Sequence, residues 1–439
     1  RTRIMRKKDS EDLVRVGPGT TMGKMMRQYW LPAAMSSELK PDGEPMRLML
    51  LGEQLIAFRD SAGRIGVMDH KCPHRCASLF LGRNEGNGLR CVYHGWKFDT
   101  DGNCVDMPSV PPARDFKHLV HAKAYKAVER NGLVWVYMGD RKTAPALPRI
   151  EATLLPEHDV TINFVQRECN WLQALEGDID TCHFGFLHAG GIEPDMVSPD
   201  NLFRYTVTNR APDYHVADTD VGTMYAAYRD GDPGETYWRF ANFMLPFWTQ
   251  TPQGKFTEHL HNRAWVPMDD HHTMFVSLVW KRHPPGVGPD KNGNLMPGFG
   301  RVFDYLPNTT DWYGRWRLKG RPVNDWMIDR AVQAEGVNYT GITGIHAQDQ
   351  AVTESMGPIT DHLFEHLGPS DMMIMRTRRR LLQAARAFAK GTVPPGVDDP
   401  EKMYAVRSGD FLTDAGLDWR KAYAREMEAS VRPLKQAAE

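Results

Sequence analysis

Short runs of alternating hydrophobic and polar residues fill the chain between residues 30 and 140. They are bounded by turn residues such as Gly52 and Asp60–Gly63, and period-two alternation between turns is typical of β-strands. The strands predicted in this way include Arg47–Leu51, Leu55–Arg59, Ile65–Asp69 and Leu133–Met138. We therefore predict a small all-β domain over residues 30–140. Residues 1–29 are predicted to form an N-terminal segment with a short helix from Met22.

A second β-rich block follows a proline-punctuated linker, residues 141–155. Its predicted strands are Ile162–Glu168, Phe203–Asn209, His215–Asp218, Thr223–Tyr228, Tyr237–Phe243, Lys255–Trp265 and Thr273–Trp280. Hairpin-like spacing between consecutive runs favours an antiparallel sheet. The last third is helical in pattern, with predicted helices at Asp325–Glu335, Asp349–Met356, Met372–Ala389 and Leu417–Val431. The pattern therefore predicts an α+β protein whose second domain spans residues 156–439.

Composition and charge place the chain among ordinary globular proteins and exclude several kinds of partner. Its 439 residues are 41% hydrophobic and 25% charged, which is enough material for two domains or for one large domain with an insertion. With 54 basic and 55 acidic side chains the formal net charge is −1, so the balance favours neither a nucleic acid nor an anionic membrane as a partner. No apolar run is long enough to span a membrane, so we expect none of the chain to do so.

Cysteine usage indicates the compartment in which the protein works. The six cysteines show no spacing typical of a disulfide framework, which favours a reducing compartment and hence the cytoplasm. The basic start of the chain is not followed by an apolar stretch, so it is not a secretory signal. Because the first residue is Arg1 and not methionine, we expect the chain to be trimmed.

Two cysteine–histidine pairs carry the strongest chemical signal. Cys72 and His74 form C-x-H, and sixteen residues later Cys91 and His94 form C-x2-H. Two thiolates and two imidazoles fit a [2Fe–2S] cluster with the cysteines on one iron and the histidines on the other. Neutral imidazoles raise the reduction potential, so such a centre accepts electrons from an ordinary ferredoxin. A structural zinc is the alternative, but zinc sites are typically built from pairs of like residues, C-x2-4-C and H-x3-5-H.

A second group of polar residues lies in the predicted second domain. Gln173, Glu176, Asp180 and His183 are spaced by three, four and three residues, which predicts one face of a helix. His188 follows five residues after His183, and the glycine between them allows the backbone to bend so that the two imidazoles converge. Two histidines that share a site need an anionic third ligand to make the facial triad of a non-haem Fe(II) oxygenase. The alternative is a helix whose polar face meets solvent, which the surrounding apolar residues disfavour.

The motifs around these residues resemble those of a known family. The turns C-P-H-R and C-V-Y-H-G-W are similar to the Rieske domain of ring-hydroxylating oxygenases. Residues 180–188 are similar to the D-x2-H-x4-H motif of the α subunits of these oxygenases. Residues 344–371 resemble the Q-D-x-A-x2-E-S-x-G-P-I pattern of the phthalate dioxygenase branch. These stretches and the helical C-terminus extend the resemblance over nearly the whole chain.

The resemblance implies two metal centres together with their ligands. The ligands of a Rieske [2Fe–2S] cluster would be Cys72, His74, Cys91 and His94. The ligands of a mononuclear Fe(II) would be His183, His188 and Asp349. Glu354 is the alternative third ligand to this iron, because it lies on the same predicted helix. Asp180 would hydrogen-bond to a ligand histidine and also bridge to His94 of a neighbouring subunit.

The same resemblance implies a fold, an activity and a set of partners. An all-β Rieske domain would be joined to a helix-grip catalytic domain, an antiparallel sheet with helices. The protein would be the terminal oxygenase that dihydroxylates an aromatic, carboxylated, phthalate-like substrate with O2. Electrons would come from a separate NAD(P)H-dependent reductase of the flavin and ferredoxin type, and the chain would form a trimer or hexamer. Monooxygenation or O-demethylation of an aryl ether is the alternative reaction. A Rieske electron carrier is the alternative of another class, which the second metal site disfavours.

The most aromatic run of the chain is a candidate for the substrate pocket. Alternation along Tyr237–Gln250 places Trp238 and Phe240 on one face of a strand and Arg239 on the other, so that one face lines a cavity or packs as ordinary sheet core. The arginines available to bind a carboxylate are Arg204, Arg210, Arg239 and Arg263. The alternating His259 and His261 are predicted to be polar groups of the sheet surface or of the pocket.

Overall fold

The computed structural model describes residues 5–282, 286–300 and 303–438, and side chains as far as Ser430. Residues 1–4 of the predicted N-terminal segment lie outside the described residues, as do residues 283–285, 301–302 and 439 of the predicted second domain. The chain begins with two short helices, α1 (Lys7–Val14) and α2 (Thr21–Met26). Only the second was predicted, and its start is fixed by the Thr20 hydroxyl, which accepts a hydrogen bond from the backbone N–H of Gly23 at 3.1 Å.

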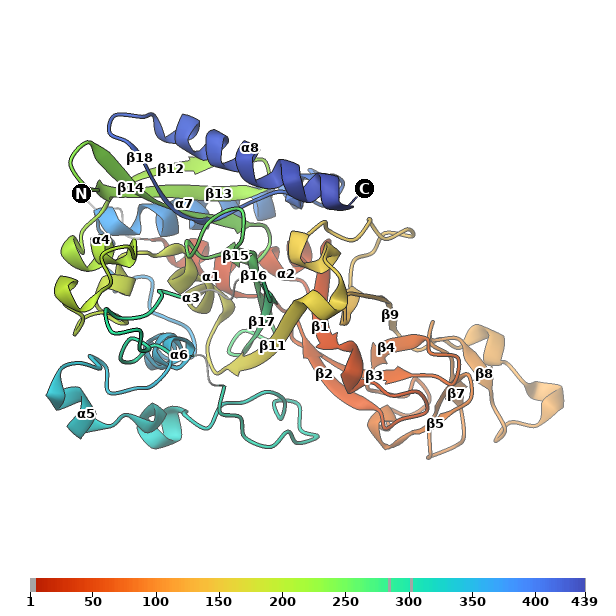
Figure 1. Cartoon of the computed structure of the whole chain (residues 1–439). Helices are drawn as coiled ribbons and strands as arrows, with labels where there is room; N and C mark the ends of the chain where they lie inside the picture. The colour runs from red at the N-terminus through yellow and green to blue at the C-terminus, as the bar shows by residue number, and fades with distance from the viewer. Residues whose placement is uncertain (1–4, 283–285, 301–302, 439) are drawn as a thin grey trace.

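Two antiparallel sheets follow, as the alternating pattern predicted for residues 30–140. The larger sheet has the strand order β1-β10-β9-β4-β3-β2. Its strands are β1 (Trp30–Met35), β2 (Met46–Leu50), β3 (Glu53–Arg59), β4 (Ile65–Asp69), β9 (Ala124–Arg130) and β10 (Leu133–Tyr137). The smaller sheet comprises β5 (Arg83–Glu85), β6 (Gly88–Arg90), β7 (Lys97–Phe98) and β8 (Cys104–Asp106). Figure 1 shows the smaller sheet at one end of the molecule, beyond β3 and β4.

An eight-stranded antiparallel sheet forms the centre of the rest of the chain. Its order is β11-β17-β16-β15-β14-β13-β12, and β18 also pairs with β14. The strands are β11 (Val160–Arg167), β12 (Asp213–Asp218), β13 (Gly222–Asp230), β14 (Glu235–Met244), β15 (Trp248–Gln250), β16 (His261–Pro267), β17 (Thr273–Trp280) and β18 (Gly409–Asp414). Every residue of β17 is buried, which accounts for its mainly apolar sequence.

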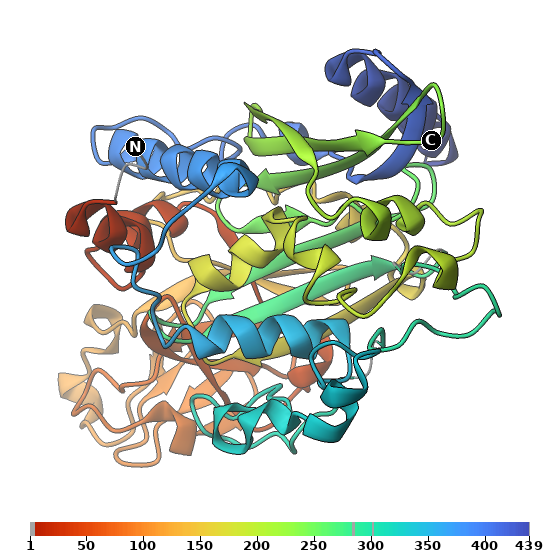
Figure 2. The ribbon, with the colours of Figure 1, turned by 90° about the vertical axis from the view of Figure 1, so that its left-hand side faces the viewer.

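Six α-helices in the described residues accompany this sheet. They are α3 (Trp171–Glu176), α4 (Phe203–Thr208), α5 (Arg330–Glu335), α6 (Ile345–Ser355), α7 (Met372–Phe388) and α8 (Trp419–Ala438). The C-terminal helix α8 lies along the β12–β14 side of the sheet (Figure 1). There Trp419 and Ala422 pack in one buried cluster with Trp238 and Phe240. Helix α7 contacts both N-terminal helices, as Figure 2 shows. Together with the sheets, these helices confirm the predicted α+β class.

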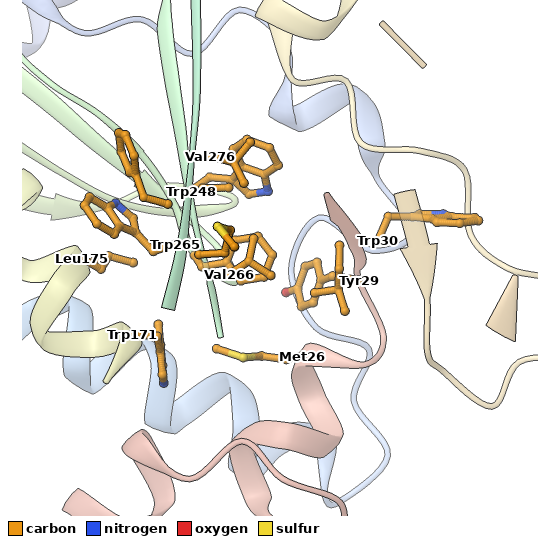
Figure 3. Close-up of a cluster of buried hydrophobic side chains, with 14 of the residues drawn as sticks. Met26, Tyr29, Trp30, Trp171, Leu175, Trp248, Trp265, Val266 and Val276 are labelled. Atoms are coloured by element: carbon orange, nitrogen blue, oxygen red, sulfur yellow. The ribbon is translucent and has the colours of Figure 1, made fainter. Parts of the chain in front are cut away.

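One hydrophobic core extends through both large sheets. Figure 3 shows Trp30 from the first sheet and Trp171, Trp248 and Trp265 from the second region in this core. Trp135 of the first sheet belongs to it as well. The rings of Trp135 and Trp248 stack across the junction with centroids 6.0 Å apart. Because a fully buried large apolar side chain contributes about 1.5–3 kcal/mol, these residues firmly join the two parts of the chain. The division into domains at residues 140 and 155 remains a prediction.

Two of the predicted strands were wrong in whole or in part. Residues 203–208 form α4 instead of a strand, because the Asn201 side chain accepts a hydrogen bond from the N–H of Phe203 at 3.0 Å and starts a helical turn. Phe203 and Val207, one helical turn apart, then pack in the same buried cluster. The predicted strand Lys255–Trp265 begins only at His261, because a turn closes on the carbonyl of Lys255.

In the part of the chain that the structure describes, no helix has both the length and the apolar character needed to cross a membrane.

Candidate functional site

The two cysteine–histidine pairs lie on two turns with the same backbone pattern. In the first, the N–H of Cys72 donates to Ala77 and the N–H of Cys76 donates back to Cys72; in the second, Cys91 stands in the place of Cys72, and Gly95 in that of Cys76. The residue that closes each turn has positive φ, +63° at Cys76 and +78° at Gly95. A Cβ at Gly95 would lie 2.8 Å from a Pro108 carbon, so glycine is required there.

The side chains on these turns are arranged with thiols inside and imidazoles at the tip. Cys72 and Cys91 are buried, and burial together with the neighbouring Cys91 raises the pKa of Cys72 to about 12 in the metal-free chain. The ring of His74 lies 4.4 Å from that of His94, centroid to centroid. Nδ1 of His94 is buried and accepts or donates no hydrogen bond to any described residue, so it is available as a metal ligand.

These four residues do not form a site for a single ion. Among the residues that the structure describes, one group of three or more potential ligands has atoms that all lie within 4.8 Å of one another, and it consists of His183, His188 and Asp349. Two thiolates combined with two imidazoles suit a [2Fe–2S] cluster, whereas structural zinc sites are typically built from pairs of like residues.

The predicted helical face around Asp180 was wrong. Helix α3 ends at Glu176, and after a short 3-10 turn Asp180 has extended backbone angles, φ −118° and ψ 109°. Gln173 instead donates a hydrogen bond to the backbone carbonyl of Gly357 at 2.8 Å, and Glu176 pairs with the buried Arg378 at 2.6 Å. Neither of these two residues reaches the histidines. The break occurs because the segment turns to bring Asp178 under the β-sheet, where Thr249 donates a hydrogen bond to it at 2.6 Å.

The two histidines nevertheless converge on one carboxylate. Nε2 of His183 lies 3.3 Å, and Nε2 of His188 3.1 Å, from the same Asp349 oxygen. A 3-10 turn at His183–Gly185 brings the histidines together. Helix α6 supplies Asp349, which lies more than 160 residues further along the chain. Glu354, the alternative third ligand, lies outside this group because it accepts hydrogen bonds from the backbone of Glu168 and from the indole of Trp326.

The electrostatics of this group favour a bound cation. Burial lowers the pKa of His183, but the carboxylates of Asp180 and Asp349 outweigh burial and raise it well above its ordinary value. Burial raises the pKa of Asp349, and the two imidazoles outweigh it and hold the pKa well below its ordinary value. Two imidazole nitrogens that face one buried carboxylate need a positive charge between them, so the donor set fits a divalent metal ion.

Asp180 lies beside this group and close to the molecular surface. Its Oδ1 accepts a hydrogen bond from the N–H of Cys182 at 2.7 Å, and its Oδ2 lies 3.5 Å from Nδ1 of His183. The Asp180 side chain is 21% exposed. One oxygen of the carboxylate therefore holds the turn, while the side chain as a whole is only partly buried.

Gln348, which the sequence reasoning missed, fixes the orientation of His188. Its Oε1 lies 2.7 Å from Nδ1 of His188, and its Nε2 donates to the carbonyls of Ile342 at 2.8 Å and Gly298 at 3.2 Å. Because only the amide nitrogen can donate to two carbonyls, the oxygen must face the histidine and accept a hydrogen bond from Nδ1–H. Nε2 of His188 is then unprotonated and faces Asp349.

We expect Gln348→Leu to weaken binding of a divalent metal at this group by about 10- to 100-fold, because His188 loses the acceptor that holds its tautomer. Titration of the metal-free protein with Co(II), followed by its visible absorption, measures the affinity. Gln350→Leu is the matched control, since Gln350 is also buried on α6 but donates to Glu354 at 2.7 Å. Equal affinities in wild type and Gln348→Leu would show that Gln348 has only a packing role.

Two adjoining cavities lie next to the group. A small cavity of about 30 Å³ touches His183, His188 and Asp349, and a larger one of about 340 Å³ opens from it between the sheet and α6. We call these the metal cavity and the large cavity. The large cavity has aromatic walls, including Phe275 and Phe303, and a polar lining that includes Asn163, Ser277 and Lys281. This combination suits a flat aromatic molecule with one polar group.

The structure separates the four arginines that were candidates for a carboxylate partner. Arg204 pairs with Asp232 at 2.8 Å, and Arg210 donates to the carbonyls of Gly185 and Ile192, each at 2.8 Å. Arg239 lines the metal cavity but not the large cavity, and Arg263 lines both.

The aromatic strand and the paired histidines also have clear places. Trp238 and Phe240 pack in the core under α8, so the sheet-core interpretation holds for that face of β14, while Arg239 on the other face reaches the metal cavity. His259 and His261 are 4% and 5% exposed, so neither lies on the sheet surface. His261 lines the large cavity.

The chain is similar in sequence to two family models and several known proteins, and similar in fold to solved structures. A family model described as "LigXa C-terminal domain like" matches residues 136–438, and a "Rieske [2Fe-2S] domain" model matches residues 29–123. The 3-chlorobenzoate-3,4-dioxygenase oxygenase subunit of Comamonas testosteroni is 53% identical over 97% of this chain and 99% of its own length. The phthalate 4,5-dioxygenase oxygenase subunit of Pseudomonas putida is 37% identical over 94% and 93%. A solved structure of the Pseudomonas putida CBB5 protein NdmA, a mutant with caffeine, has the same fold: TM-score 0.55 and 19% identity, over 91% of this chain and all of that one.

Proposed function

This chain belongs to the Rieske non-haem iron ring-hydroxylating oxygenases and is an α subunit of that family, and we propose that it dihydroxylates an aromatic carboxylic acid with O2. The family has a Rieske [2Fe–2S] cluster and a mononuclear iron. The observation that carries the proposal is the convergence of His183, His188 and Asp349 beside an aromatic-walled cavity. A pure electron carrier would need neither the triad nor the cavity.

We propose that the Rieske cluster is held by Cys72, His74, Cys91 and His94. The matching backbone of the two turns supports this assignment, because a cluster with paired ligands is best met by two equivalent loops. Buried thiols next to the inner iron and more exposed imidazoles next to the outer iron would let an electron enter or leave at the His74 and His94 tip.

We propose that His183, His188 and Asp349 hold the mononuclear iron, with Gln348 orienting His188. When bound, the cluster supplies single electrons and the mononuclear iron supplies the means to activate O2. The chain's own residues bind the substrate, keep its ring next to the iron and exclude water from the metal cavity. Three protein ligands leave positions open at a facial site, which suits this division of labour.

The substrate class rests on the relatives and on the cavity. The two relatives are named for dioxygenation of 3-chlorobenzoate and phthalate, both of which are aromatic acids. In this chain the aromatic walls of the large cavity and the cation at Arg263 suit the same class.

We propose that the working enzyme is a homotrimer, alone or paired as a hexamer, in which Asp180 contacts His94 of the partner subunit. Within one chain the small β5–β8 sheet lies at one end and α6 towards the other, as Figure 1 shows, so a neighbouring chain is the better electron donor. Exposed apolar side chains near both sites support such a contact. Val92 and Tyr93, next to His94 in the chain, are each 54% exposed, and Phe186, between His183 and His188, is 53% exposed.

The remaining partners follow from the reaction. Dioxygenation of a ring by O2 consumes two electrons, and we propose that a separate NAD(P)H-dependent reductase of the flavin and ferredoxin type supplies them to the Rieske cluster. The six free cysteines, two of them proposed as cluster ligands, support a reducing compartment, and we propose the cytoplasm.

A single turnover of the pre-reduced, iron-loaded protein tests the proposed reaction. We expect an aromatic acid to gain two oxygen and two hydrogen atoms, which mass spectrometry of the products detects. Aryl methyl ethers belong in the same panel. Formaldehyde release from an ether without dihydroxylation of any acid would make the protein an O-demethylase, and oxidation of the cluster without any product would leave only electron transfer.

A further inference from the structure

Arg263 connects the two cavities. Gln253, Arg263 and Ile345 are the lining residues that the large cavity shares with the metal cavity, and Arg263 is the only cation among them. A molecule in the large cavity with one end at the metal therefore passes this guanidinium. Lys281, the other cation of the large cavity, does not line the metal cavity and donates to the backbone carbonyl of His158 at 2.7 Å.

The guanidinium is fixed in place from two sides. Its Nη1 donates to Oδ1 of Asp178 at 2.6 Å, and its Nε donates to Nε2 of His261 at 3.2 Å. The Asp178 carboxylate is held in turn by Thr249 and by the Trp265 indole, which donates to it at 3.0 Å. Nη2 of Arg263 donates no hydrogen bond to another described residue. A guanidinium carries five N–H groups, so the Asp178 pair leaves donors for a second acceptor.

Arg239 is less suited to the same task. Its Nε donates to the Thr181 hydroxyl at 2.9 Å and its Nη1 to the Tyr237 hydroxyl at 3.3 Å, so it is tied to the floor of the small metal cavity. A carboxylate placed there would compete with the reacting ring for a volume of about 30 Å³. The large cavity beside Arg263 has room for both groups in line.

We propose that Arg263 binds the carboxylate of the substrate, and that Asp178 is the positioning residue that aims the guanidinium into the cavity. The proposal rests on the proposed function and makes it more specific. The acid group lies against Arg263, and the ring lies against Phe275 and Ile345 with one edge towards the metal cavity. With one fixed guanidinium at this junction, the class of substrate that it fits is an aromatic acid with one carboxylate next to the reacting ring.

The test compares binding of benzoate and of neutral benzamide to the iron-loaded protein by titration calorimetry. We expect Arg263→Gln to weaken benzoate binding by about 10- to 100-fold, because a charge-assisted hydrogen bond is lost, and to change benzamide binding little. Arg263→Lys should restore part of the affinity for benzoate. Lys281→Gln is the matched control, since it removes a cation of the same cavity away from the metal, and we expect a change of less than about threefold.

The iron content and the absorption of the [2Fe–2S] cluster show whether each variant is folded and loaded. Equal benzoate affinity in wild type and Arg263→Gln would overturn the inference and leave the oxygenase function intact, and so would a larger loss in Lys281→Gln. A wild type that binds no benzoate would overturn it as well. If benzoate bound through Arg263 but no aromatic acid was ever oxygenated, the inference would stand and the proposed reaction would fail.

Steady-state kinetics separate substrate binding from a general structural defect. For an acid substrate, Arg263→Gln should mainly raise KM, while a neutral aromatic substrate keeps its kcat/KM. Asp178→Asn should raise KM for the acid less than Arg263→Gln does, because the guanidinium is still present but is no longer aimed by a charged partner. A similar loss of kcat/KM for acidic and neutral substrates in Arg263→Gln would mean that the residue only supports the fold, which would contradict the proposal.

Discussion

Asp349→Ala protein is expected to keep the iron and visible absorption of its [2Fe–2S] cluster, to lose the mononuclear iron, and to oxygenate no aromatic acid. The physical reason is that, among the described residues, Asp349 supplies the one negative charge that both His183 and His188 face at 3.1–3.3 Å. Without it two neutral imidazoles remain, and they bind a divalent ion far more weakly than a facial triad does. We expect the rate of oxygenation to fall on the order of 10³-fold or more.

Iron analysis, cluster absorption and product yield in a single turnover measure this effect. The matched control is Glu354→Gln on the same helix, because the Glu354 carboxylate accepts hydrogen bonds from Glu168, Gln350 and Trp326 and not from the histidines. That variant should keep all its iron. Loss of iron from Glu354→Gln, together with full retention in Asp349→Ala, would show that the wrong carboxylate was assigned to the metal.

Asp180→Asn is expected to retain both metal centres and yet to lose about 100-fold or more in turnover. The amide can still accept the bond from the N–H of Cys182, so the turn that positions His183 is preserved. It removes the charge that lies 3.5 Å from Nδ1 of His183 and that, on the proposed trimer, meets His94 of the partner subunit. The electron path between the two centres is therefore weakened while the centres stay intact.

Stopped-flow absorption of the pre-reduced cluster, mixed with substrate and O2, follows the electron directly. We expect slow reoxidation of the cluster in Asp180→Asn and fast reoxidation in wild type. Asp371→Asn is the control for loss of a carboxylate near Asp180. Burial and the charge of Asp180 raise the pKa of Asp371, and its carboxylate accepts a hydrogen bond from the N–H of Gly368 at 2.7 Å. Fast reoxidation in Asp180→Asn would mean that electrons take another route.

The sequence was sufficient where the signal was local. The C-x-H and C-x2-H spacings determine two equivalent turns, because each turn is closed by backbone hydrogen bonds within six residues of its cysteine. Short apolar runs between turns predicted β4 and β17 with their observed bounds, since each pairs with a neighbouring strand along its full length. His183 and His188 were found for the same reason, because a single short turn brings them together.

The sequence was insufficient where distant segments decide the structure. A spacing of three and four residues predicted one helix through Asp180, but hydrogen bonds from β15 and β16 to Asp178 end that helix early. The role of Gln348 depends on carbonyls of Ile342 and Gly298, and no pattern in the chain marks a glutamine for such a contact. The Arg263–Asp178 pair joins residues 85 positions apart, so one arginine among four could not be chosen in advance.

The stacked rings of Trp135 and Trp248 have a consequence for how the protein unfolds. Residues of both large sheets share one core, and the predicted linker between them is partly inside it, with Glu151 buried and paired with Arg407 at 2.6 Å. A fragment cut at this linker would expose tryptophan surface that no other part of the fragment covers. We therefore expect the two halves to unfold together, and we expect a fragment that holds only the electron-storing half to be less stable than the intact chain.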